Sequence, residues 1–165
     1  EGDILSGDFG VKLNGYCGDA AITIPIGSID AKKQKLLDVT KGMLDIAVDM
    51  IGPGKKWSEI ASVMENHAKR SGFSVVRDYV GHGIGTEMHE EPKVQNFVSR
   101  ELLKNDIYLK EGMILAVEPM VNMGTHRAKT LKDGWTVVTA DKKCSAHFEH
   151  TIAVVNDGSR VLTKL

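Results

Sequence analysis

The chain has 165 residues and a mass of 18.0 kDa, and its 42% hydrophobic and 26% charged residues are typical of a soluble globular domain. With 21 Lys and Arg against 22 Asp and Glu, the formal net charge is −1, which argues against a protein that binds nucleic acid by neutralising phosphates. No apolar run approaches the ~18 residues of a membrane span, and the two cysteines, Cys17 and Cys144, are far apart, so we expect a cytoplasmic protein without membrane contact.

The first residues resemble the middle of a domain sequence rather than its beginning. The chain begins Glu1-Gly2-Asp3, without an initiator Met, signal peptide or transit peptide, and continues directly into the apolar pair Ile4-Leu5. We therefore expect residues 1–165 to form a single domain whose N-terminal portion lies upstream of Glu1. A large exposed apolar patch on the first strand or on the helices would support this expectation.

A β-hairpin is predicted over residues 4–24, with Asn14-Gly15 as its two-residue turn, because this dipeptide is the strongest short signal for a hairpin. In that register Gly10 pairs with Asp19, and Asp8 lies two residues from Gly10 on the same face. Diagonal neighbours of this kind are ~7–8 Å apart, so the two aspartates could bind a cation between them.

Two helices are predicted to follow the hairpin. The first begins at a capping residue, Ser28 or Asp30, extends to about Ile51 and ends at Gly52-Pro53-Gly54. The second covers about Ser58 to Ser71. Apolar residues recur at helical spacing in both segments, so each helix should bury one stripe of side chains.

The remainder of the chain has mostly β character, apart from a polar, irregular stretch over 92–111. This order of elements predicts an α+β fold in which a helical layer covers one face of a curved, mostly antiparallel sheet. The expected strands lie near 73–80, 113–123, 128–131, 134–140, 144–155 and 159–164.

Several charged or metal-ligating residues lie in apolar surroundings within or beside the predicted strands. Glu118 follows Met113-Ile114-Leu115-Ala116-Val117, and Glu149 precedes a run of β-branched residues. A buried charge is costly unless it is paired or bound to a metal. Any one of these carboxylates could simply point into water, and His82 alone could be a core histidine. The glycines around His82 suggest a phosphate-binding loop, but no helix follows them, so nucleotide binding is not expected.

Four segments carry a pattern that spans nearly the whole chain. They are Gly7-Asp8-Phe9 with Gly18-Asp19; Gly81-His82-Gly83-Ile84-Gly85 with Met88-His89-Glu90-Glu91-Pro92; Glu118-Pro119-Met120-Val121-Asn122; and Ser145-Ala146-His147-Phe148-Glu149-His150-Thr151. In this order they resemble the motifs of methionine aminopeptidases of the bacterial-type, or type I, branch. Prolidases and proline-specific aminopeptidases share the metal ligands but carry an arginine-containing segment around the last glutamate.

The resemblance implies a hydrolase with the pita-bread fold and two divalent metal ions. Asp8 would chelate one ion, Asp19 and Glu149 would bridge both, and His82 and Glu118 would complete the second. Two such ions can hold a bridging water and lower its pKa. Four carboxylates and one imidazole favour Mn²⁺, Fe²⁺ or Co²⁺ over a thiolate-type zinc site, and the sequence leaves the choice among Mn, Fe, Co and Zn open.

Three further residues have roles that the resemblance implies. His89 would donate a hydrogen bond to the scissile peptide, while Glu118 would also transfer a proton between the bridging water and the leaving amine. Met88 and Trp135 would line the pocket for the methionine side chain, where soft, apolar walls suit a thioether. Ordinary core packing is the alternative reading for Met88 and, less so, for Trp135.

The chain departs from the family pattern at three points. The upstream segment, which carries another active-site histidine, is absent, and Gly7 stands where an apolar strand residue is usual. His147 replaces a residue that is usually Gln. Strand alternation places His147 on the same face as Glu149, so we expect it to contact the site.

The function implied by the resemblance is removal of the N-terminal methionine from nascent proteins with a small second residue. The partners would be nascent polypeptide N-termini, with the ribosome as a place of encounter, and the protein would be a monomer. The alternative is a catalytically inactive pita-bread module that binds a peptide or protein. Related modules usually lack several metal ligands, whereas this chain has all five.

Overall fold

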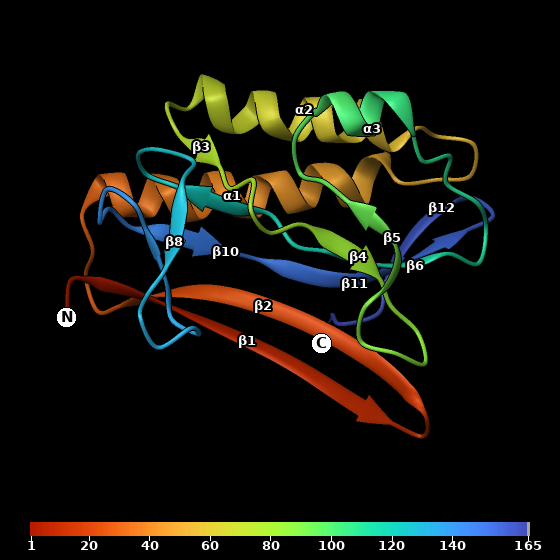
Figure 1. The fold of residues 1–165 in the computed structure, drawn as a ribbon, viewed down its shortest axis with the longest axis horizontal. Coiled ribbons are helices and arrows are strands. Elements are labelled where there is room, and N and C mark those ends of the chain that lie inside the picture. The colour runs from red at the N-terminus through yellow and green to blue at the C-terminus, as the bar shows by residue number, and fades with distance from the viewer. Residues whose placement is uncertain (165) are drawn as a thin grey trace.

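The computed structural model describes residues 1–164, and its largest element is a twisted antiparallel sheet (Figure 1). Among these residues the sheet has seven strands in the order β1-β2-β11-β6-β4-β5, with β12 paired to β11. Its strands are β1 (Asp3–Leu13), β2 (Tyr16–Ile26), β4 (Gly81–Gly83), β5 (Glu90–Val94), β6 (Ile114–Val117), β11 (Glu149–Val155) and β12 (Gly158–Val161).

Two smaller sheets extend this framework. The strand order β10-β7-β3 joins segments that are far apart in the chain, and β8 and β9 form a separate hairpin. Their bounds are β3 (Ser74–Val75), β7 (Met120–Asn122), β8 (Ala128–Thr130), β9 (Val137–Thr139) and β10 (Ser145–His147).

The helices lie together on one side of the main sheet (Figure 1). They are α1 (Ala31–Met50), α2 (Trp57–Arg70) and the short α3 (Arg100–Lys104). Asp30 caps α1, because its side chain accepts hydrogen bonds from the backbone N–H groups of Lys32 and Lys33. The core lies between this layer and the sheet; its central members include Leu36, Met43, Ile60, Met64, Leu115, Val117 and Ile152.

These observations confirm the α+β prediction and the hairpin in detail. The turn is at Asn14-Gly15, both with positive φ, and Gly10 pairs with Asp19 as expected. The two long helices also lie where the sequence predicts them. The expected strand over 73–80 is limited to Ser74–Val75.

The prediction of an irregular stretch over 92–111 is wrong, since β5 extends into it and α3 lies within it. The segment around His82 forms a strand, β4, as expected for a residue within or beside a predicted strand. Its glycines permit this pairing, because a Cβ on Gly81 would overlap the Ala116 carbonyl oxygen and one on Gly83 would overlap the Glu91 carbonyl oxygen. The glycines therefore let neighbouring strands approach His82 closely on both sides.

One face of the β1–β2 hairpin is apolar and exposed. The register Phe9↔Ala20 and Leu13↔Tyr16 places these side chains opposite the face that carries Asp8. Phe9 is 70% exposed. Exposed apolar patches of this kind are surfaces against which other segments or molecules pack. The large exposed apolar side chains of this hairpin are Leu5, Phe9, Val11, Leu13, Tyr16, Ile22, Ile24 and Ile26.

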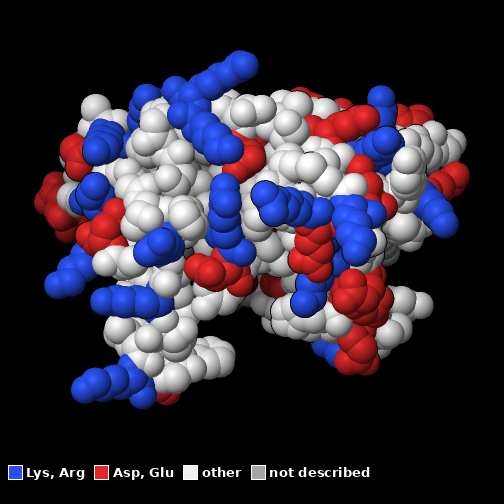
Figure 2. Space-filling view, turned by 45° about the horizontal axis from the view of Figure 1, so that its top comes forward, with Lys and Arg blue, Asp and Glu red and all other residues white. Residues whose placement is uncertain are grey.

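The face of the molecule drawn in Figure 2 carries charged side chains of both signs. Lys and Arg side chains are interspersed with Asp and Glu over the face drawn in Figure 2. This distribution agrees with the balanced composition of the chain. None of the helices among residues 1–164 has both the length and the apolar character required to cross a bilayer.

Candidate metal centre

The strand register brings Asp19 and His82 into one row across the sheet. The hydroxyl of Thr151 on β11 accepts a hydrogen bond from the Asp19 N–H at 2.9 Å and donates to the Asp19 carbonyl at 2.8 Å. Thr151 pairs with Ala116 on β6, and Ala116 pairs with His82 on β4. Side chains level with one another on adjacent strands point to the same face. Asp19 and His82 therefore face the same space across two small intervening residues.

A second row lies two residues along the strands and contains the other carboxylates. Asp8 pairs with Ala21, and Ala21 pairs with Glu149. Glu118 directly follows β6, in which Val117 pairs with His150, so Glu118 lies level with Glu149. The alternation of strand side chains places this row on the same face as Asp19 and His82.

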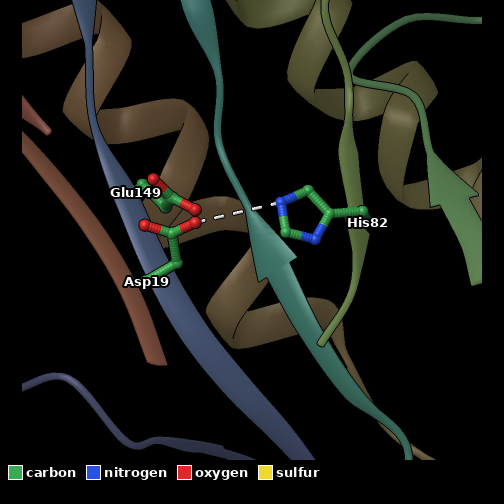
Figure 3. A group of neighbouring side chains, drawn as sticks. All are labelled: Asp19, His82 and Glu149. Atoms are coloured by element: carbon green, nitrogen blue, oxygen red, sulfur yellow. Dashed lines mark ion pairs between the residues drawn. The ribbon is translucent and has the colours of Figure 1, made fainter. Parts of the chain in front are cut away.

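The ligand atoms of Asp19, His82 and Glu149 all lie within 4.8 Å of one another (Figure 3). The His82 Nε2 atom is 3.5 Å from Glu118 Oε1 and 4.0 Å from Asp19 Oδ2. Two donor atoms that are each about 2.1 Å from one ion lie roughly 3.0 to 4.2 Å apart, depending on the bond angle. These separations are long for direct hydrogen bonds and suit a shared cation.

The orientation of His82 also suits a metal ligand. Its Nδ1 atom is 2.9 Å from the Gly83 carbonyl oxygen, which can only accept a hydrogen bond. The hydrogen-bond network therefore assigns the proton to Nδ1 and leaves the lone pair of Nε2 directed at the carboxylates. Metal-ligating histidines are commonly held by such a bond from the other ring nitrogen.

Three buried polar atoms around this space have no hydrogen-bond partner within residues 1–164: Asp19 Oδ1, Glu149 Oε1 and His147 Nε2. Glu149 is only 2% exposed. Buried polar groups are almost always satisfied, and an unpaired buried carboxylate is particularly costly. The residues present thus fit a divalent cation, whose charge and coordination would satisfy these atoms.

The crowding of carboxylates raises the pKa values of both glutamates. Burial, and then the charges of Glu118, Asp19 and Asp8, raise the pKa of Glu149 to about 9. Burial, Asp19 and Asp8 likewise raise the pKa of Glu118 to about 8. In the metal-free protein these groups therefore retain protons at neutral pH, and a bound cation must displace them.

Asp8 and His147 lie at one side of the cluster. The Asp8 side chain is 59% exposed, and its Oδ2 atom is 4.0 Å from His147 Nδ1. His147 Nε2 is 3.9 Å from Glu118 Oε2 and 4.0 Å from Glu149 Oε2. The expected contact of His147 with the site is thus present. Burial lowers the pKa of His147, although Asp8 and Asp19 act in the opposite direction.

The three predicted substrate-contacting residues have different surroundings. The ring of His89 is exposed and lies 4.4 Å, centroid to centroid, from that of His82. The terminal methyl of Met88 lies over Gly10, next to Asp19, so Met88 is beside the cluster rather than in the core. Trp135 is 88% exposed, in the connection between β8 and β9, which excludes its core-packing alternative. Their roles toward a substrate stay predictions.

Thr151 is a positioning residue that the sequence analysis did not single out. The signal was available, because Thr151 lies two residues after Glu149 on the same strand face and Thr23 is similarly placed after Ala21. Neither threonine could be assigned to Asp19 or His147 without the pairing of β2 with β11, which joins segments about 130 residues apart.

We expect Thr151→Val to lower the free energy of unfolding by about 1–3 kcal/mol, because it leaves the Asp19 N–H and carbonyl without their partner in a buried place. Urea unfolding of the full-length protein measures this change. Thr40→Val is the matched control: Thr40 is equally buried, but its hydroxyl donates only to the Leu36 carbonyl within α1. Equal losses in both variants would contradict the role given to Thr151.

Comparison with known proteins identifies the family of this chain. A model of metallopeptidase family M24 matches residues 1–156. The chain belongs to metallopeptidase family M24. Its curated relatives include methionine aminopeptidase 1 of Bacillus subtilis, 46% identical over 165 residues, and the methionine aminopeptidase of Clostridium perfringens, 45% identical over 163 residues. These alignments cover 100% and 99% of this M24 chain, which spans only 65% and 64% of the two relatives.

Solved structures have a similar fold. The crystal structure of methionine aminopeptidase from Thermotoga maritima matches with a TM-score of 0.95 and 42% identity, covering 100% of this chain and 65% of that one. Prolidase from Pyrococcus furiosus matches with a TM-score of 0.75 and 26% identity, covering 99% and 42%. The pita-bread fold and the resemblance to methionine aminopeptidases are thereby confirmed.

Proposed function

We propose that this M24 protein is a metal-dependent aminopeptidase that removes the N-terminal methionine from nascent proteins with a small second residue. Residues 1–165 would form one metallopeptidase domain that holds the metal-binding part of the catalytic site. The observation that carries the proposal is the convergence of Asp19, His82, Glu118 and Glu149 on one space, with buried ligand atoms that lack partners. The names of the curated relatives support the choice of methionine as substrate.

The residues of the two rows would hold two divalent cations, for which Mn, Fe, Co and Zn are candidates. Asp8 would bind the first ion, His82 and Glu118 the second, and Asp19 and Glu149 both. When bound, such cations activate water and polarise the scissile carbonyl. Asp8 lies at the more exposed side of the cluster. That placement suits the end of the site that receives the free α-amine of a substrate.

The chain's own side chains would position the substrate and move protons. Glu118 lies beside the space that the carboxylates share, so its carboxylate can accept a proton from the attacking water and donate it to the leaving amine. His89 is exposed and adjacent to His82, where its ring can donate a hydrogen bond to the carbonyl under attack. Met88 and Trp135 would contact the methionine side chain.

The surroundings expected for this activity are the cytoplasm and the N-termini of new polypeptides, including those emerging at the ribosome. We expect the protein to act as a monomer without nucleic acid or membrane. The balanced charge, and the mixture of both signs on the face drawn in Figure 2, support the expectation that no nucleic acid is bound.

Release of methionine from a Met-Ala peptide by the full-length protein tests the function. We expect release in the presence of Mn²⁺, Fe²⁺ or Co²⁺, and its loss after chelation. An Ala-Pro dipeptide, a substrate suited to a prolidase, should not be cleaved. Absence of methionine release from a protein that demonstrably contains metal would contradict the proposal and favour an inactive peptide-binding module.

A further inference from the structure

The backbone of His147 is fixed to the hairpin that carries the two aspartates. The His147 N–H donates to the Thr23 hydroxyl at 2.8 Å, and that hydroxyl donates to the His147 carbonyl at 2.7 Å. Ser6 on β1 lies 2.7 Å from the same hydroxyl. Ser6, Thr23 and His147, which lie on three different strands, thus form a third row. It lies next to the row of Asp8, Ala21 and Glu149. This row directs the His147 ring to the face of the carboxylates.

The ring of His147 then lies among carboxylates with no direct hydrogen bond to them. Its Nε2 atom is 3.9 Å from Glu118 Oε2 and 4.0 Å from Glu149 Oε2. It is buried and has no partner among the described residues. A buried ring nitrogen at this distance from two carboxylates has the separation that an intervening cation would create.

Glu118 lies between two imidazoles in a nearly symmetrical way. Its Oε1 atom faces His82 Nε2 at 3.5 Å, and its Oε2 atom faces His147 Nε2 at 3.9 Å. Both rings also have an acceptor near their other nitrogen: the Gly83 carbonyl for His82 at 2.9 Å and Asp8 Oδ2 for His147 at 4.0 Å. The hydrogen bond to the Gly83 carbonyl gives His82 a proton on Nδ1 and a free lone pair on Nε2, and His147 can adopt the same tautomer to present its Nε2 lone pair to a cation.

We propose that His147 is a sixth protein ligand of the metal centre and binds a cation through Nε2, together with Glu118 and Glu149. The inference rests on the metal centre of the proposed function and adds a second imidazole to it. Imidazole nitrogen favours Zn²⁺ and Co²⁺ relative to Mn²⁺, which prefers oxygen ligands. His147 would thus shift the metal preference of this centre toward the nitrogen-binding ions.

X-ray absorption at the cobalt edge tests the ligand directly, with the full-length protein loaded with Co²⁺ and its metal content measured. For two bound ions we expect imidazole scattering from two rings in the wild type and from one ring in His147→Gln. His67→Gln is the matched control, because His67 lies on α2 and packs against Gly42 of α1. It should retain the wild-type scattering.

A second measurement is the affinity for each ion, determined by competition with a chelator. We expect His147→Gln to bind Zn²⁺ about 10- to 100-fold more weakly while its Mn²⁺ affinity changes much less. Scattering from a single ring in the wild type, or unchanged scattering in His147→Gln, would overturn the inference; the wild-type spectrum alone decides if the variant does not fold.

The two proposals fail separately in these experiments. Imidazole scattering that falls in His147→Gln, from a protein that releases no methionine, supports the ligand and contradicts the peptidase. Methionine release with scattering from one ring supports the peptidase and contradicts the ligand.

Discussion

Replacing Glu149 by Gln should lower kcat/KM for methionine release by about 10³-fold or more and remove bound metal. The carboxylate is 2% exposed and lies level with both Glu118 and Asp8. Glutamine preserves the size of the side chain but offers a neutral oxygen and an N–H₂ group that cannot bind a cation. Loss of one preorganised electrostatic group already costs a factor of about 10²–10³ in other hydrolases. A ligand shared by two ions should cost at least as much.

Activity with saturating Co²⁺ and metal content after gel filtration measure this effect. Glu111→Gln is the matched control, because Glu111 is an exposed glutamate in the turn before β6. It should retain metal and activity. Wild-type metal content and activity in Glu149→Gln would contradict the assignment of Glu149 as a ligand.

The metal-free protein should lose stability as the pH rises from 7 to 9. The pKa values of Glu118 and Glu149 are raised from 4.5 to about 8 and about 9 in the folded state. Between pH 4.5 and these values the folded chain binds more protons than the unfolded chain, so the stabilisation that is complete below pH 4.5 falls progressively over this range, and its loss is complete only above pH 8 for Glu118 and above pH 9 for Glu149. The loss should be on the order of several kcal/mol, because each group is mostly buried.

Urea unfolding in EDTA at pH 7, 8 and 9 measures this slope. The range lies above the region in which His147 and His150 titrate, since burial lowers the pKa of both. Glu149→Gln should flatten the slope and make the metal-free protein more stable than the wild type at pH 9. Adding Co²⁺ to the wild type should reverse the trend, because deprotonated ligands bind the cation more tightly. A metal-free stability that rises from pH 7 to 9 would contradict this account.

Much of the site could be predicted from the sequence because it depends on the alternation of side chains between the two faces of a strand. Asn14-Gly15 determines the turn, and the turn determines that Asp8 and Asp19 share a face. His147 was likewise placed on the face of Glu149 by alternation alone. The pairing of β2 with β11 could not be predicted this way, because nothing local in either strand identifies its partner. Thr151 was missed for that reason.

The wrong prediction over 92–111 has a local cause. β5 contains Glu90, Glu91 and Pro92, which are unfavourable in a central strand, but β5 lies at the edge of the sheet, where a proline costs no ladder hydrogen bond on the outer side. α3 has only five residues, too few for helical periodicity to be visible, although Ser99 caps it and Leu102 is buried. The glycines of β4 allow close packing against β5 and β6.

The two-residue turn of the hairpin restricts how many residues can separate Asp8 from Asp19 along the chain. Because Gly10 pairs with Asp19, inserting one residue on each side of the turn extends the tip and leaves both aspartates in place, whereas a single inserted residue forces a bulge or rotates one aspartate toward the apolar surface. Length variants of this loop should therefore be tolerated when an even number of residues is added and poorly tolerated when the number is odd. The hairpin can therefore be lengthened without moving the aspartates only by adding residues in pairs, one to each strand.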